Sequence, residues 1–325
     1  MPRPGRVLIT GGAGFLGSHL ARRLRTLGVE VRLLDDLSGA PEGNLPRELA
    51  PELLFRGDVR DEALLRRAVR DCEAVVHLAD RPVSANDPTE GFGVNTQGTL
   101  ALMRACQDLK VPRVVLASSC SVYGSTGAPP LSEGRPPGPV SLVGASKASA
   151  EALVRVFAEQ GALHAVVLRF FHVYGPGRIT SRTPGVLALF GREVASGRPP
   201  QVHGSGELLR DFVHVEDGVE ALRLALERKV ANWTVANVGT GVGTSLRTAA
   251  EAVAAALGRL DLEPVSVDPP PGPSVNAFAD LRAARASLGF SPKIGLVEGL
   301  QRKDFHLPLP PSSGGHEGTT STAVP

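Results

Sequence analysis

Three glycines with a fixed spacing, Gly11, Gly14 and Gly17, follow a short apolar run in the segment TGGAGFLGSHL (10–20). A tight turn, the close approach of a pyrophosphate and helix-strand packing each require a position without a side chain. The helix that begins here would direct its N-terminal N–H groups at the diphosphate. Ordinary loops also use glycine, but Asp35 ends the next apolar run, about twenty residues further on, where a carboxylate can bind the adenosine ribose. The spacing predicts a dinucleotide site, and therefore hydride-transfer chemistry.

The carboxylate of Asp35 also bears on which nicotinamide cofactor binds. A negative charge at this position would repel a 2′-phosphate, which favours NADH over NADPH. Arg56, Arg60 or Arg81 could compensate for that repulsion. We therefore predict NAD(P)H as the cofactor, with Asp35 alone favouring NADH.

The elements that must position these residues alternate in a regular order. Short apolar runs are separated by segments with apolar residues at three- and four-residue spacing, a pattern typical of strands alternating with helices. The predicted strands are 6–10, 30–35, 52–58, 74–79, 113–119 and 165–171, and the predicted helices are 16–27, 61–70, 95–109, 145–160, 216–229, 245–258 and 280–288. This order predicts an α/β fold, a Rossmann-type doubly wound parallel sheet with a smaller C-terminal substrate-binding domain.

The domain boundaries follow from where the alternation loosens. Residues 1–175 are predicted to be mainly the dinucleotide-binding domain, and 176–306 mainly the substrate-binding region, within which 210–240 return to the Rossmann core. Residues 307–325, LPLPPSSGGHEGTTSTAVP, have few apolar side chains and are expected to be a disordered tail.

Composition argues against several other classes of protein. The chain has 35 Lys and Arg against 33 Asp and Glu, spread evenly, so no basic surface for nucleic acid is expected. Cys72, Cys106 and Cys120 are widely spaced, which argues against a zinc site or a disulfide framework and favours a reducing cytoplasm. No apolar stretch is long enough for a membrane span or a signal peptide. We expect a cytoplasmic protein with a small-molecule substrate, no metal, and no nucleic-acid or membrane partner; a homodimer stays open.

From residue 6 to about residue 300 the chain resembles the extended short-chain dehydrogenases/reductases, the NAD-dependent epimerase/dehydratase family. The matching segments, in order, are TGGAGFLGSHL, LLDDLS, GDVRD, VVHLAD, NTQGTL, ASSCSVYG, GASK, LRFFHVYGPG, RDFVHVEDGVEAL and NVGTG. The resemblance implies that Asp58 and Val59 flank the adenine, that Leu78 and Ala79 line the nucleotide, and that Lys147 holds the nicotinamide ribose. Phe15 and Leu16 complete the predicted cofactor site.

One residue departs from that family at the centre of its chemistry. The family keeps a tyrosine four residues before the lysine, whose charge lowers the tyrosine pKa so that it can exchange a proton with the substrate oxygen. In SLVGASK (141–147) this position is Val143, which cannot donate, accept or ionise. Ser119 matches the family residue that hydrogen-bonds the same oxygen. We therefore assign the catalytic roles to Ser119 and Lys147, with Ser118 and His172 as further candidates.

Three functions stay open at this point. The preferred one is an NAD(P)H-dependent ketoreductase for a bulky aromatic polyketide in antibiotic biosynthesis. A substrate phenol would supply the proton, as expected for the atypical ketoreductases of angucyclinone pathways, which the chain also resembles.

The second function is a nucleotide-sugar epimerase or dehydratase. It is disfavoured because acid-base catalysis supplies about 10² to 10⁴ in rate, which a valine cannot provide. PPPGPS (269–274) also replaces the segment that commonly brings an arginine to the diphosphate, although Arg210 is retained. The third function is a non-catalytic NAD(P)-binding protein.

Overall fold

The computed structural model describes residues 3–39, 45, 51–83, 87–125, 127–161, 163–177, 185–269 and 275–302. The tail predicted to be disordered lies outside these residues, as do residues 270–274 of the PPPGPS segment.

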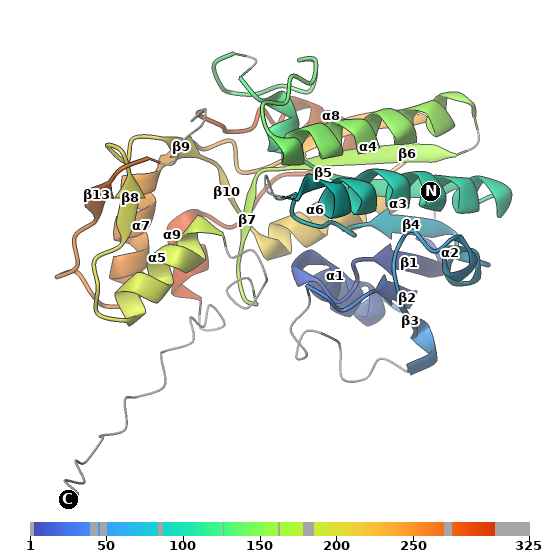
Figure 1. Ribbon diagram of the computed structural model, residues 1–325, viewed down its shortest axis with the longest axis horizontal. Helices are drawn as coiled ribbons and strands as arrows, with labels where there is room; N and C mark the ends of the chain where they lie inside the picture. Colours follow the sequence, from blue (N-terminus) through green and yellow to red (C-terminus); the bar gives the residue numbers. More distant parts are fainter. Residues whose placement is uncertain are drawn as a thin grey trace, which may run out of the picture.

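Seven parallel strands form the central sheet (Figure 1). In sheet order they are β11 (Trp233–Val238), β6 (His164–Phe170), β5 (Arg113–Ser119), β4 (Ala74–His77), β1 (Arg6–Thr10), β2 (Glu30–Asp35) and β3 (Leu54–Arg56). The strand order runs outward in both directions from β1, so the topology reverses between β1 and β4. Ligands of such sheets bind at this reversal, beyond the carboxyl ends of the strands. The predicted doubly wound α/β fold is confirmed.

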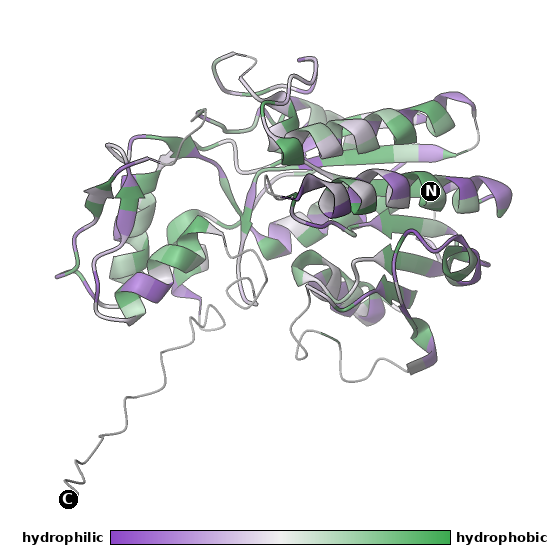
Figure 2. Cartoon of the chain, viewed as in Figure 1, coloured by the Kyte–Doolittle hydropathy of each residue, from purple (hydrophilic) through white to green (hydrophobic). Residues whose placement is uncertain are grey.

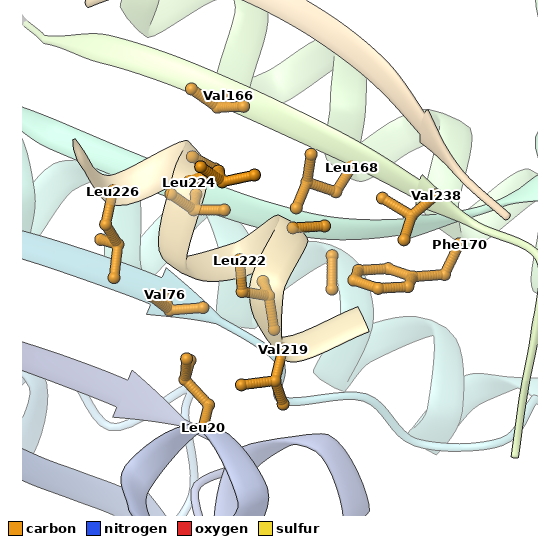
Figure 3. Close-up of a cluster of buried hydrophobic side chains, with 14 of the residues drawn as sticks. Leu20, Val76, Val166, Leu168, Phe170, Val219, Leu222, Leu224, Leu226 and Val238 are labelled. Atoms are coloured by element: carbon orange, nitrogen blue, oxygen red, sulfur yellow. The ribbon is translucent and has the colours of Figure 1, made fainter. Parts of the chain in front are cut away.

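Helices cover both faces of the sheet. The helices α1 (Phe15–Thr26), α6 (Val215–Glu227) and α8 (Arg282–Leu288) lie on one face, and α2 (Glu62–Val69), α3 (Pro88–Asp108) and α4 (Leu142–Glu159) lie on the other. Successive residues of β1 point to opposite faces, so Val7 and Ile9 enter the first core and Leu8 the second, and all three are fully buried. This double burial explains the continuous apolar run at β1. Figure 3 shows part of the first core, with Val219 and Leu222 of α6 among strand side chains.

The start of α3 differs from the sequence-based prediction. The helix begins at Pro88 and not at residue 95, because Asp87 accepts from the N–H of Thr89 and proline is favourable at the first helical position. Within this first part, Gly91 lies so close to the preceding loop that a Cβ would be 2.5 Å from the carbonyl oxygen of Pro82. The close contact packs the loop after β4 onto α3.

A smaller body lies to one side of the sheet, at the left in Figure 1. It consists of α5 (Val186–Ala195), α7 (Leu246–Ala256) and α9 (Leu296–Gln301), with the short pairs of β13 (Val265–Val267) with β8 (Gln201–His203) and β12 (Thr244–Ser245) with β9 (Leu209–Arg210). The pair of β7 (His172–Tyr174) and β10 (Phe212–His214) lies between the two parts. The smaller body has its own apolar core, which includes Phe190, Val202 and Val253. In Figure 2 much of α5 and α7 is coloured as hydrophobic.

Candidate active site

A cleft of about 450 Å³ opens at the carboxyl ends of the central strands and extends to α5 of the smaller body. The predicted cofactor residues that line it are Gly11, Gly14, Phe15, Leu16, Gly17, Asp35, Asp58, Val59, Leu78, Ala79 and Lys147. The catalytic candidates Ser118, Ser119 and His172 line the same cleft. A dinucleotide and a second molecule could therefore lie against each other in one continuous space.

The glycine-rich loop has the shape that a pyrophosphate requires. Gly11 has a φ of 66°, and a Cβ on Gly17 would lie 2.2 Å from the carbonyl oxygen of Gly11, so both positions exclude a side chain. The N-cap of α1, Gly14, makes no side-chain capping bond, and the first turn carries no acidic residue. The first N–H groups of α1 can therefore bind an anion. These residues fit a dinucleotide.

Asp35 connects the loop to the end of β2. Its Oδ2 accepts from the N–H of Ala13 at 2.9 Å and its Oδ1 from the N–H of Leu37 at 2.8 Å. Burial raises the pKa of this carboxyl group, while the two backbone hydrogen bonds act in the opposite direction. The side chain thus holds the loop closed and faces the cleft where the adenosine ribose is predicted to bind.

Two arginines at this end of the cleft are bound to carboxylates. Arg60 donates to Asp58 at 2.9 and 2.6 Å and to Glu90 at 2.9 Å. Arg81 donates to Asp36 and to Glu90, both at 2.7 Å. Arg60 is also the main cause of the lowered pKa of Asp58. Because carboxylates neutralise both guanidinium groups, neither arginine is available to bind a 2′-phosphate in this arrangement.

Ser119 and Lys147 both line the cleft near the end of β5. The Oγ of Ser119 accepts from the N–H of Ser121 at 3.1 Å and from its hydroxyl at 3.0 Å, which caps the short helix η3 (Cys120–Tyr123). Lys147 lies on α4, and its Nζ donates to the carbonyl oxygen of Ala117 at 3.3 Å. Since Ala117 and Ser119 are on the same strand, this bond fixes α4 next to the predicted catalytic serine.

The other catalytic candidates have different surroundings. Val143 lies one helical turn before Lys147 and is half-buried, but it is not among the described residues that line the cleft. The hydroxyl of Ser118 donates to Glu151 in the protein interior. His172 is half-buried on β7, and its ring meets the edge of Phe212 at 5.9 Å between centroids. Of these three, Ser118 and His172 line the cleft.

Asp80 is a site residue that the sequence reasoning missed. It follows β4, lines the cleft, and places Oδ1 2.9 Å from Nζ of Lys147. The residue ends the segment VVHLAD, which resembles the family, but its carboxylate was not predicted to have a role in the site. A carboxylate just beyond the carboxyl end of β4, beside the reversal of strand order, was the available signal.

No three His, Cys, Asp or Glu side chains of the described residues are grouped in a way that could hold a metal ion. Within the same part of the chain, no helix is both long and apolar enough to cross a membrane.

Comparison with known proteins agrees with this geometry. Residues 7–239 match the NAD dependent epimerase/dehydratase family. The chain belongs to this family. The family resemblance, its fold and the expectation of a nicotinamide dinucleotide are thereby confirmed, since the family is described as NAD dependent.

Family members of known structure cover almost the whole chain. The UDP-glucose 4-epimerase of Thermotoga maritima, solved with UDP-glucose, has a TM-score of 0.85 at 32% identity and covers 91% of this chain and 96% of its own. That of Thermus thermophilus, solved with NAD, has a TM-score of 0.81 at 35% identity with the same coverage. The UDP-glucose 4-epimerase of Azospirillum brasilense is 32% identical over 91% of this chain and 90% of its own length.

These relatives correct the preferred sequence-based function. The prediction of a ketoreductase of aromatic polyketide biosynthesis is wrong, because the relatives named above are UDP-glucose 4-epimerases. The inference failed because it rested on two local departures, Val143 and the PPPGPS segment, and such losses do not identify the substrate. The alternative of a nucleotide-sugar epimerase or dehydratase is the better supported reading.

Proposed function

We propose that this chain is an NAD-dependent enzyme that binds a nucleotide sugar and reversibly oxidises one of its hydroxyl groups, as an epimerase or dehydratase. The observation that carries the proposal is the single cleft, which joins the glycine-rich loop to Ser119, Lys147 and the smaller body. The relatives named above, one of which was solved with UDP-glucose, support the choice of substrate class.

Arg210 is a candidate for binding the substrate diphosphate. It ends β9 on the side of the smaller body, and its Nη1 donates to the carbonyl oxygens of Leu209 at 3.0 Å and Val275 at 2.6 Å. Burial lowers the pKa of this guanidinium. Carbonyl oxygens orient the group without neutralising its charge, which suits an anionic ligand.

The roles of the central residues follow from their chemistry. The bound dinucleotide supplies a hydride acceptor. Ser119 is positioned to hydrogen-bond the reacting oxygen, and Lys147 to hold the nicotinamide ribose and stabilise negative charge nearby. Val143 takes no part in proton transfer, so the proton of the sugar hydroxyl requires another acceptor.

Conversion of nucleotide sugars tests the proposal directly. The purified protein is incubated with NAD and either UDP-glucose or UDP-galactose, and the products are separated by chromatography while bound cofactor is followed at 340 nm. Interconversion of the two sugars, or formation of a keto sugar, supports the proposal. Tight binding of NADH without conversion of these or of dTDP-glucose would instead identify a non-catalytic NAD-binding protein.

A further inference from the structure

The cleft contains an ion pair between Asp80 and Lys147 that the predicted site does not use. Oδ1 of Asp80 lies 2.9 Å from Nζ of Lys147. The lysine side chain is 13% exposed, whereas that of Asp80 is 40% exposed. The ammonium group is therefore enclosed, and the carboxylate beside it is open to the cleft.

The topology places Asp80 at the same edge of the sheet as the predicted catalytic serine. β4 and β5 are parallel neighbours in which His77 lies opposite Leu116. Asp80 and Ser119 are each three residues beyond this pair, so the two parallel strands bring them to the same edge of the sheet. Lys147 bridges the two strands, because it contacts both Asp80 and the carbonyl oxygen of Ala117 on β5.

The segment that carries Asp80 is held on both sides. The N–H of Ala79 donates to Thr10 at 3.3 Å. The amide of Asn95 on α3 accepts from the N–H of Arg81 at 2.8 Å and donates to its carbonyl oxygen at 3.1 Å. These bonds fix the backbone before and after Asp80, so its carboxylate has a defined position in the cleft.

Arg81, the charged residue that follows Asp80, is already paired. Arg81, the next residue, donates to Asp36 and Glu90, which lie toward the adenosine end of the cleft. Among the residues that the structure describes, Lys147 is the cation that forms an ion pair with Asp80. An ionised carboxylate is a hydrogen-bond acceptor, and a neighbouring ammonium can stabilise both it and a developing alkoxide.

We propose that Asp80 is the catalytic residue that accepts the proton which the family's tyrosine would otherwise take. This inference rests on the proposed function. A bound dinucleotide would accept the hydride of the sugar hydroxyl carbon with its two electrons, and the O–H proton moves to the carboxylate of Asp80. A carbonyl group remains on the sugar, and return of the hydride and of the same proton restores a hydroxyl. Lys147 keeps its proton throughout.

Asp80→Asn tests this assignment because it keeps the size of the side chain and removes the proton acceptor. Two quantities are measured, the Kd of NADH by its fluorescence and the single-turnover rate of cofactor reduction by UDP-glucose. We expect the Kd to stay within about threefold of wild type and the rate to fall about 100-fold or more. Asp261→Asn is the matched control, since it removes a carboxylate from an exposed ion pair with Arg259.

A second variant separates proton transfer from a structural role. Val143→Tyr introduced into the Asp80→Asn chain should restore the rate at least about tenfold, because a tyrosine four residues before Lys147 projects from the same helix face. A variant that misfolds or merely displaces Lys147 would not be rescued in this way, and absence of rescue overturns the assignment.

The remaining outcomes are equally decisive. An active wild type with an equally active Asp80→Asn variant overturns the role of Asp80 and leaves the proposed function intact. A rate that falls only in proportion to weakened NADH binding also overturns it, since Asp80 would then act by orienting Lys147. A wild type that converts no nucleotide sugar overturns the proposed function, and the role of Asp80 with it.

Discussion

Arg169 of β6 donates two hydrogen bonds to the carboxylate of Glu151 on α4, at 3.0 Å to Oε1 and 2.7 Å to Oε2. The two side chains are only 4% and 5% exposed. Ser118 also donates to Glu151, which lies four residues after Lys147 on the same helix. The buried ion pair fixes the helix that carries Lys147 to β6, and the Ser118 bond fixes it to β5, the strand that carries Ser119.

Breaking this pair should destabilise the protein strongly. Arg169→Met leaves the carboxylate of Glu151 buried without its partner, for which we expect a loss of about 3 to 5 kcal/mol in the free energy of unfolding. Urea denaturation measures the loss. Glu159→Gln is the control on the same helix, where an exposed pair with Arg155 should contribute less than about 1 kcal/mol. Equal effects of the two substitutions would contradict the structural role of the buried pair.

Gly17→Ala should impair cofactor binding. The new Cβ would lie 2.2 Å from the carbonyl oxygen of Gly11, so the loop would have to move away from α1. We expect the Kd of NADH, measured by fluorescence titration, to rise at least about tenfold, equivalent to about 1.4 kcal/mol. Gly134→Ala is the matched control, because a Cβ there meets nothing within 4 Å. Unchanged NADH affinity in Gly17→Ala would show that the loop does not contact the cofactor.

The wild-type protein should bind NADH at least about tenfold more tightly than NADPH, a difference of about 1.4 kcal/mol. The carboxylate of Asp35 repels a 2′-phosphate, and Arg60 and Arg81 are bound to carboxylates that neutralise them. Titration with both reduced cofactors under identical salt conditions gives the ratio. A preference for NADPH would mean that Arg56 binds the 2′-phosphate, or that Arg60 or Arg81 leaves its carboxylates when the cofactor binds.

The free energy of unfolding should decrease as the pH falls, and part of this decrease should come from His77. Its ring is buried between Thr10 and Thr99, and burial lowers its pKa from 6.5 to about 3. The unfolded chain therefore takes up a proton near pH 6.5 that the folded protein does not. The contribution of His77 to stability is complete above pH 6.5 and is lost as pH falls from 6.5 toward 3, by about 1.4 kcal/mol per pH unit.

Urea denaturation at pH 7.5 and pH 5.5 checks this dependence. Asn can donate and accept at the same site without titrating, so His77→Asn should lose about 1 kcal/mol less than wild type between the two pH values. An identical loss in both proteins would show that His77 is protonated, or accessible to water, in the folded state.

The dinucleotide half of the protein could be predicted from the sequence, because its signals act over short distances. The glycine spacing from Gly11 to Gly17 determines a turn and a helix start within one segment, and Asp35 follows at the end of the next strand. The alternation of apolar runs with helical patterns is equally local, and it predicted the parallel sheet correctly. The early start of α3 was missed because its cap, Asp87, precedes the apolar periodicity.

The reacting end of the cleft was decided by the tertiary structure. The spacing of four residues between Val143 and Lys147 showed that the family's tyrosine is missing. The sequence did not reveal which other ionisable group lies close to Lys147. Asp80 and Lys147 belong to a loop after β4 and to α4, and they meet only because parallel strands end at one edge of the sheet and α4 packs beside them. Side-chain contacts between distant segments depend on this packing, which periodicity and spacing along the chain do not encode.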